Sequence, residues 1–308
     1  MTAIEKAASG ASHPTASAPA SFRAASPARG IRGFARRRPI TCFVLIVLAI
    51  AWPAFIIPIA LGVPTDPSKL LVTVVVMLGT ASLITPWTSG RAGVRELFAG
   101  VRRWRIGVGN YLLVLAAMPV LTILVALATG TFQQPDGGWI RMIGSYLIAT
   151  VLIGALVLNL WEETAWSGFV QSRLMDRHGL VAGAALTALP FIAIHLPLAF
   201  EGDHISVGSV ALSWTALAGL AFFLRYVIGS VYLNTGGSVL AAGLLHASFN
   251  SSGSLAVLRG DAWWQNIVAT LVLCALVAGH RWYRGRSAAA AGAGGRAEVT
   301  AAPGSADR

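Results

Sequence analysis

The sequence is poor in charged residues. Only 11% of its 308 residues are Asp, Glu, Lys or Arg, whereas ordinary soluble domains carry about 25%. Hydrophobic residues make up 56%, and the mean hydropathy is +0.69. A soluble fold cannot hide that much apolar surface, so an ordinary soluble domain is excluded. The apolar residues form helix-length runs, which predicts an all-α membrane bundle because lipid tolerates only a backbone that satisfies its own hydrogen bonds.

Cysteine is also scarce. Cys42 and Cys274 are the only two cysteines of the chain. Both lie inside apolar runs, and they lack the close C-x-x-C spacing of a zinc or redox site. We interpret them as small buried hydrophobes.

The net charge of +11 does not indicate nucleic-acid binding. A nucleic-acid binder gathers its basic residues on a soluble domain with a reading element, whereas here they lie at the ends of apolar runs. Arginines beside membrane spans are what the positive-inside rule and anionic lipid headgroups favour. We therefore predict the lipid bilayer, and no nucleic acid, as a partner.

The apolar runs are long enough to cross a membrane several times. A bilayer core about 30 Å thick requires about 20 apolar residues per helix, which gives about eight transmembrane helices. The predicted spans are 40–61, 70–87, 111–128, 140–160, 180–200, 207–226, 237–250 and 267–280. The segment 91–105 is different, because its apolar residues recur at helical spacing opposite arginines. That pattern predicts an interfacial amphipathic helix.

The chain divides into three parts by composition. Residues 1–38 are polar and basic and residues 286–308 are rich in Ala and Gly, so both are predicted to be disordered. Residues 39–285 form the transmembrane domain. Basic segments alternate with weakly charged loops along it, which predicts that both termini are cytoplasmic. The abundance of Ala, Gly and Arg indicates a bacterial cell membrane.

Ionisable side chains at membrane depth are costly, so those inside apolar runs are candidates for function. The strongest are the adjacent Glu162 and Glu163 in NLWEETAWSGFVQ, followed by His195 in PFIAIHLPL. The third group is His246 and Asn250 in AAGLLHASFN. Their i,i+4 spacing places an imidazole and a carboxamide on the same helix face.

These side chains suit hydrolysis of an amide. A carboxylate in a dry pocket can take a proton from water as a general base. Histidine and asparagine donors aimed at one point can stabilise the oxyanion of a tetrahedral intermediate. Alternatively, His195, His246 and Glu162 could hold a divalent metal such as zinc with an open coordination position.

Each group also has an ordinary structural interpretation. Adjacent glutamates at a helix start are favoured by the helix dipole. His195 alone, or His246 with Asn250, is compatible with hydrogen bonding between membrane helices. The ordered combination of all three groups on successive spans favours function.

The motifs resemble those of the CPBP family of intramembrane proteases, which comprises type II CAAX prenyl proteases and bacteriocin-processing proteins and is also called Abi. That family shows EExxxR, then FxxxH, then HxxxN or HxxxD on successive membrane helices. Here the matching stretches are EETAWS at 162–167, FIAIH at 191–195 and HASFN at 246–250. The similarity covers a motif-bearing core at 161–253.

The resemblance implies a hydrolase, namely a CAAX-type intramembrane endopeptidase that cleaves a membrane-associated protein or peptide. It implies that Glu162 activates the attacking water, with Glu163 supporting it and His195 orienting that water. His246 and Asn250 would form the oxyanion site. The family has been described as metalloproteases, yet its arrangement also suits a glutamate-driven reaction without an obligatory metal.

The chain departs from the family motif at Ser167, where the family has arginine. Arginine pairs with a carboxylate and keeps it ionised, whereas serine offers only a neutral hydrogen bond. Either another arginine substitutes, with Arg173 and Arg225 as the nearest candidates, or the chain is a catalytically impaired, peptide-binding homologue. A transporter that uses the same ionisable residues as a proton or cation path is the rival from another class.

Overall fold

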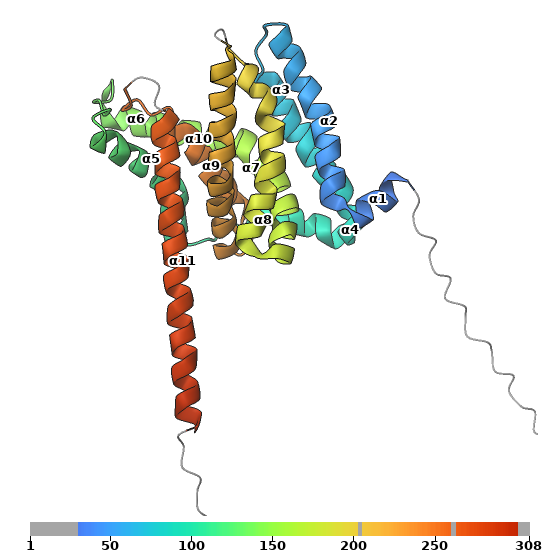
Figure 1. The fold of residues 1–308 in the computed structure, drawn as a ribbon, viewed down its shortest axis with the longest axis vertical. Coiled ribbons are helices and arrows are strands. Elements are labelled where there is room, and N and C mark those ends of the chain that lie inside the picture. Colours follow the sequence, from blue (N-terminus) through green and yellow to red (C-terminus); the bar gives the residue numbers. More distant parts are fainter. Residues whose placement is uncertain (1–29, 203–204, 260–262, 301–308) are drawn as a thin grey trace, which may run out of the picture.

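The structure is a computed structural model, and it describes residues 30–202, 205–259 and 263–300. Every named element in these ranges is a helix, which confirms the predicted all-α membrane bundle (Figure 1). The α-helices are α1 (Ile31–Arg37), α2 (Pro39–Ala60), α3 (Asp66–Leu70), α4 (Leu78–Ala99), α5 (Val108–Ala128), α6 (Gly138–Leu147), α7 (Leu160–Ala165), α8 (Ser172–His195), α9 (Val207–Asn234), α10 (Val239–Ser252) and α11 (Trp263–Thr300). Wider π-helical turns form η1 (Leu71–Met77), η3 (Ile148–Asn159) and η4 (Trp166–Gln171), and tighter 3-10 turns form η2 (Gly100–Arg102) and η5 (Leu196–Phe200).

Six helical stretches of the described chain are long and apolar enough to cross a membrane. The fourth of them, Gly138–Phe200, contains two of the predicted spans. The remaining predicted span is α10, whose 14 residues extend only about 21 Å. It is too short to cross the hydrocarbon core alone, and neighbouring helices surround it instead.

Two glycines separate membrane spans from polar helical segments. Gly90 has φ of 63° inside α4, and Gly179 has φ of 76° inside α8. Residues other than glycine rarely adopt this left-handed region, so each glycine permits a sharp change of direction. The segment after Gly90 is the amphipathic helix expected at 91–105, and it ends in η2.

Different helices and different polar contacts lie at the two ends of the bundle. In Figure 1, α1 and the last turns of α4 lie at the lower end, whereas α3 lies at the upper end. The lower end is tied together by hydrogen bonds from Arg103 Nη1 to the Gly237 carbonyl at 3.2 Å and from Arg281 Nη1 to Asn234 Oδ1 at 3.3 Å. The upper end is tied by the ion pair of Lys69 with Glu201 at 3.1 Å.

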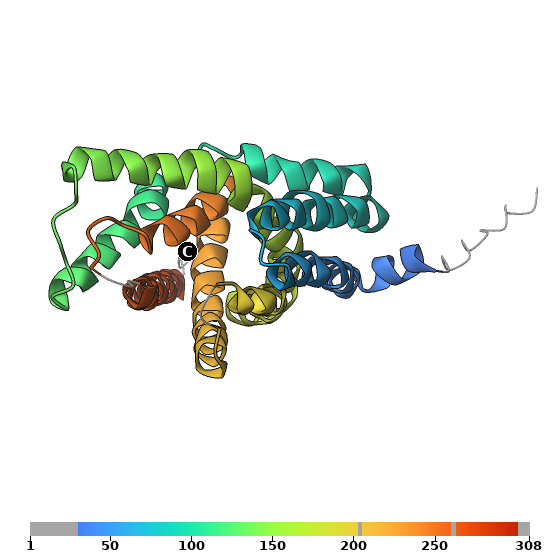
Figure 2. The ribbon, with the colours of Figure 1, turned by 90° about the horizontal axis from the view of Figure 1, so that it is seen from above.

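Figure 2 shows that the helical stretch from α6 to α7 lies across the bundle, while α11 is seen end-on.

The spans expose much of their apolar surface. Only 17% to 44% of each candidate span is buried within the protein. Large apolar side chains on the outside include Leu45, Ile57, Leu124, Ile153 and Leu276. Hydrocarbon is the medium that such a surface requires, and the chain is therefore an integral membrane protein.

The helix α10 forms the centre of the bundle. Residues 241–248 are all buried, and small residues allow its backbone to approach its neighbours. A Cβ added to Gly243 would lie 3.0 Å from the Leu160 Cα, and one added to Gly154 would lie 2.9 Å from the Ala247 Cβ. Close contact through small residues is the usual way in which membrane helices pack, and here it brings α10 against α7.

Parts of the two terminal segments predicted to be disordered, 1–38 and 286–308, form helix in the structure. Residues 31–37 of the predicted arm form α1, whose buried Gly33 and Ala35 pack on the bundle. At the other end, α11 continues to Thr300, because the segment beyond residue 286 is rich in alanine, the strongest helix former. Residues 1–29 and 301–308 of these predicted segments lie outside the described residues.

Candidate active site

The two adjacent glutamates lie on α7 and face different surroundings. Successive residues of a helix point about 100° apart, so Glu162 and Glu163 cannot share one environment. The Glu163 side chain is fully buried, whereas 12% of the Glu162 side chain is exposed. The π-helical turns η3 and η4 flank α7, and such turns are frequent at functional sites.

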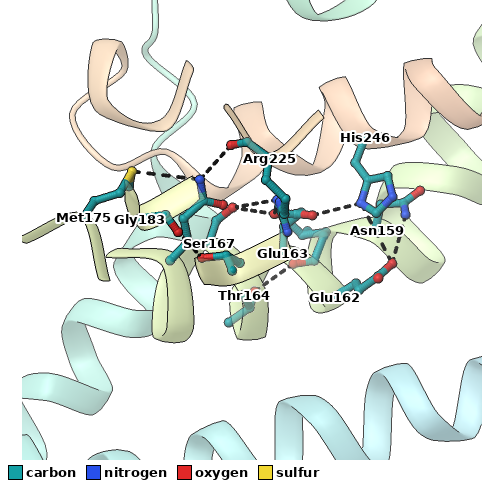
Figure 3. A network of polar contacts seen from close by, with 12 residues as sticks. Asn159, Glu162, Glu163, Thr164, Ser167, Met175, Gly183, Arg225 and His246 are labelled. Atoms are coloured by element: carbon teal, nitrogen blue, oxygen red, sulfur yellow. Dashed lines mark hydrogen bonds and ion pairs between the residues drawn. The ribbon is translucent and has the colours of Figure 1, made fainter. Parts of the chain in front are cut away.

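Both carboxylate oxygens of Glu163 have partners on buried side chains. Arg225 Nη2 donates to Oε2 at 2.6 Å, and the Ser167 hydroxyl donates to the same oxygen. His246 Nδ1 lies 2.8 Å from Oε1. Figure 3 shows these contacts converging on Glu163 from η4, α9 and α10. Glu163 therefore holds three segments of the site together, and both of its oxygens are engaged by protein side chains.

Arg225, and not Arg173, occupies the role that the family motif gives to an arginine at position 167. Arg225 comes from α9, is fully buried and lies over the Phe191 ring at 5.4 Å. The small Ser167 leaves room for it, and its hydroxyl lies 3.4 Å from Arg225 Nη2. Arg173 instead donates to the Phe169 carbonyl at 2.8 Å. The arginine absent from the motif is thus supplied by another helix.

Glu162 faces a cavity of about 230 Å³. Its polar lining consists of Lys69, Thr73, Asn159, Glu162, His195 and Asn250. The apolar part of the wall comes from α2, η1, η3, α8 and η5, and consists of Phe55, Val72, Met77, Leu158, Ile194 and Leu198. A small cavity with a few convergent polar groups in apolar walls is the usual form of an active site.

Asn159 links Glu162 to Asn250 and was not singled out from the sequence. Its Nδ2 donates to Glu162 Oε2 at 3.2 Å, and its Oδ1 accepts from Asn250 Nδ2 at 3.4 Å. Asn159 is buried at the end of η3. Two features of the sequence point to it: it is a carboxamide closing a long apolar run, and it precedes Glu162 by three residues on one helix face.

Each of the two histidines is hydrogen-bonded to another residue of the protein through its Nδ1. His195 Nδ1 lies 2.7 Å from the Phe191 carbonyl. A carbonyl only accepts, so Nδ1 carries the proton and Nε2 of His195 is left as an acceptor. His246 lies between the carboxylates, because its Nδ1 is 2.8 Å from Glu163 Oε1 and 3.9 Å from Glu162 Oε2.

The structure thus brings the five residues expected to carry chemistry to one place. Glu162, His195 and Asn250 line the cavity, while Glu163 lies behind them and His246 lies between the two carboxylates. Asn250 and His246 are one turn apart on α10, as their spacing predicts. The additional members are Asn159 and Arg225.

The metal-binding hypothesis concerns His195, His246 and Glu162. Within residues 30–202, 205–259 and 263–300, no group of three or more His, Cys, Asp or Glu side chains is placed to hold a metal ion together. His246 Nδ1 contacts Glu163, and binding of a divalent metal by this set stays a prediction.

A comparison with known families matches the part of the chain that carries the site. Residues 144–252 match the family model described as Type II CAAX prenyl endopeptidase Rce1-like. The matched stretch runs from α6 to the last residue of α10 and contains the five residues expected to carry chemistry, together with Asn159 and Arg225. This match confirms the resemblance of the motifs to the CPBP family of CAAX-type intramembrane proteases. No curated protein matches the chain.

Proposed function

We propose that this protein is an intramembrane endopeptidase that hydrolyses a peptide bond of a membrane-associated protein or peptide. The observation that carries the proposal is the division between the two glutamates. Glu162 faces a cavity, whereas Glu163 is fully buried and paired on both oxygens. One carboxylate is free to act on water, and the other holds the residues around it.

In the proposed reaction, Glu162 takes a proton from a water molecule bound in the cavity. The other O–H of that water donates a hydrogen bond to His195 Nε2 and keeps its hydrogen, so His195 orients the water. The resulting hydroxide attacks the carbonyl carbon of the scissile amide. General base catalysis of this kind contributes about 10²- to 10⁴-fold to a rate. Glu162 then gives its proton to the amine that leaves, which restores the starting carboxylate.

His246 and Asn250 are proposed to stabilise the oxyanion of the tetrahedral intermediate. Asn250 donates through Nδ2, and His246 in its imidazolium form donates through Nε2 while Nδ1 stays on Glu163. The hydrogen bond between Asn159 and Asn250 sets the direction of the Asn250 carboxamide. The apolar walls exclude bulk water, which strengthens these interactions.

The buried pair of Glu163 and Arg225 has a positioning role in this proposal. Glu163 contacts His246, and Arg225 with Ser167 holds Glu163. Charge-assisted hydrogen bonds are roughly twice as strong as neutral ones. The network therefore fixes the imidazole of His246 where an oxyanion forms, although neither Glu163 nor Arg225 touches the substrate.

The test is a comparison of protein termini in cells that carry the wild type, Glu162→Gln or Glu96→Gln. Glu96 is an exposed carboxylate at the lower end of the bundle, and its substitution is a matched control. Proteolysis predicts new termini of membrane-associated proteins in the wild type and in the control, and their loss with Glu162→Gln. Identical sets of termini from three folded proteins would contradict the proposal, and a change in ion flux instead would favour a transporter.

A further inference from the structure

A second and larger cavity lies on the other side of Asn250. Its volume is about 550 Å³, within the range of ligand sites. Asn250 lines both this cavity and the one that contains Glu162 and His195. We call it the Asn250 cavity, and its polar lining consists of Asp136, Arg141, Ser145, Tyr146, Ser251 and Ser254. A peptide that places a bond at Glu162 thus has space to continue past Asn250.

Both cavities lie toward the upper end of the bundle. The Asn250 cavity is bounded by loop residues 136 and 254–256, which belong to loops joined by the hydrogen bond from the Gln133 amide to the Val257 carbonyl at 2.9 Å. The cavity of Glu162 reaches Lys69 of α3 and Leu198 of η5. In Figure 1, α3 and the start of α6 are at the upper end.

The charges of the described residues distinguish the two ends. At the upper end, Lys69, Arg141 and Arg259 are balanced by acidic residues, namely Asp66, Asp136 and Glu201. The lower end is rich in arginine, and Glu96 and Asp176 are its acidic residues. Its arginines are Arg32, Arg36, Arg37, Arg38, Arg91, Arg95, Arg102, Arg103, Arg105, Arg173, Arg177, Arg281, Arg284 and Arg286.

The excess of arginine orients the bundle. Arg and Lys in segments next to membrane spans stay on the cytoplasmic side, so the lower end faces the cytoplasm. The cavities therefore lie toward the opposite, extracytoplasmic side. A catalytic cavity on that side cannot receive a lipid-modified tail of a cytosolic protein unless the tail is carried across the membrane.

We propose that this protein cleaves peptide segments exposed on the extracytoplasmic side of the membrane, and that the Asn250 cavity binds the chain on one side of the scissile bond. This inference rests on the proposed hydrolysis and names its substrate class. The hydroxyl and charged groups of the cavity suit the polar backbone of an extended peptide. The binding surface is continuous with the site, because Asn250 belongs to both cavities.

The orientation is tested by labelling single cysteines with a membrane-impermeant maleimide in intact and permeabilised cells. The background carries Cys42→Ala and Cys274→Ala, since both native cysteines are buried. Ser254→Cys reports on the rim of the Asn250 cavity, and the exposed Ser287→Cys reports on the lower end. Labelling of Ser254→Cys in intact cells, with Ser287→Cys labelled only after permeabilisation, is the expected result. The reverse pattern would overturn the inference and leave the proposed hydrolysis unaffected.

The role of the Asn250 cavity is tested by filling it. Ser145→Trp places an indole in the cavity, while Ile143→Trp places one on the outer face of the same helix, where Ile143 is exposed. Cleavage of a substrate identified by its Glu162-dependent terminus should fall at least tenfold in kcat/KM for Ser145→Trp and stay near wild type for Ile143→Trp. Equal rates for the two folded variants would overturn the binding role. Glu162-dependent termini that lie only in cytosolic segments would overturn the substrate class.

Discussion

Arg225 Nη2 lies 2.6 Å from Glu163 Oε2, and both side chains are fully buried although the residues are 62 positions apart in the chain. Two charges removed from water in this way stabilise each other only as a pair. The pair joins α9 to α7 and, through Glu163, reaches His246 on α10. The integrity of the site therefore depends on a helix that carries none of the family motifs.

Removing the charge of Arg225 should damage both stability and activity. Arg225→Gln leaves Glu163 buried without its cation, and breaking a buried pair costs about 3–5 kcal/mol. We expect a lower melting temperature in detergent and at least a tenfold loss of cleavage. The double variant Glu163→Gln with Arg225→Gln removes both charges and should melt at a higher temperature than Arg225→Gln alone. A melting temperature of Arg225→Gln equal to that of the wild type would contradict the pairing.

Moving the arginine to its usual motif position should restore part of the function. Ser167→Arg combined with Arg225→Ser exchanges two side chains that lie 3.4 Å apart. Ser167→Arg alone places two guanidinium groups in the buried site, and Arg225→Ser alone leaves none. The effects of the two changes should therefore be coupled by about 1–3 kcal/mol. Unfolding and cleavage measured for the four proteins of this double-mutant cycle give the coupling. Additive effects would show that the two positions do not share a role.

Asn159 should matter to catalysis more than to folding. Asn159→Ala removes a hydrogen bond to Glu162 and one to Asn250, and hydrogen bonds to charged groups contribute about 1.5–3 kcal/mol. We expect kcat to fall at least tenfold with little change in KM. Leu156→Ala on the same helix is the control, because Leu156 is exposed on the outer surface. Equal kcat values for the two variants would rule out the linking role of Asn159.

Gly243 should be required for the contact between α10 and α7. A Cβ at this position would meet the Leu160 Cα at 3.0 Å and its backbone nitrogen at 3.1 Å. Gly243→Val should push the helices apart, cost about 1–3 kcal/mol and reduce cleavage by displacing His246 from Glu163. Gly279→Val is the matched control, since no atom lies within 4 Å of an added Cβ there. Similar melting temperatures for both variants would contradict the close packing.

Much of the fold follows from local sequence. Hydropathy and length predict the membrane spans because each span is one continuous apolar segment, and the amphipathic segment after Gly90 has its own local period. The burial of α10 could not be predicted in the same way, because its 14 residues resemble a membrane span in composition. Its short length becomes visible only when its ends are known. The helices at 31–37 and beyond residue 286 were not predicted, because composition alone was used for these segments.

The relative positions of site residues on one helix could be predicted from their spacing. Contacts between residues of different helices could not, because they depend on how the helices pack. The spacing of His246 and Asn250 places them on one helix face, and the structure has them there. Which glutamate faces the cavity depends on how α10 packs against α7 and on the contact of Arg225 of α9 with Glu163, and no local pattern contains that information. The choice between Arg173 and Arg225 likewise depends on a contact across 62 positions of the chain.

The central claim is that the adjacent glutamates have separate tasks, with Glu162 acting on water and Glu163 holding the site. The direct measurement is the cleavage rate and melting temperature of purified Glu162→Gln and Glu163→Gln, with a peptide that spans a cleavage site found in cells. Glu162→Gln should melt as the wild type does and lose at least a hundredfold in kcat, whereas Glu163→Gln should melt at a clearly lower temperature because Arg225 loses its partner. A folded Glu162→Gln that cleaves at the wild-type rate would contradict the account, as would equal melting temperatures for the two variants.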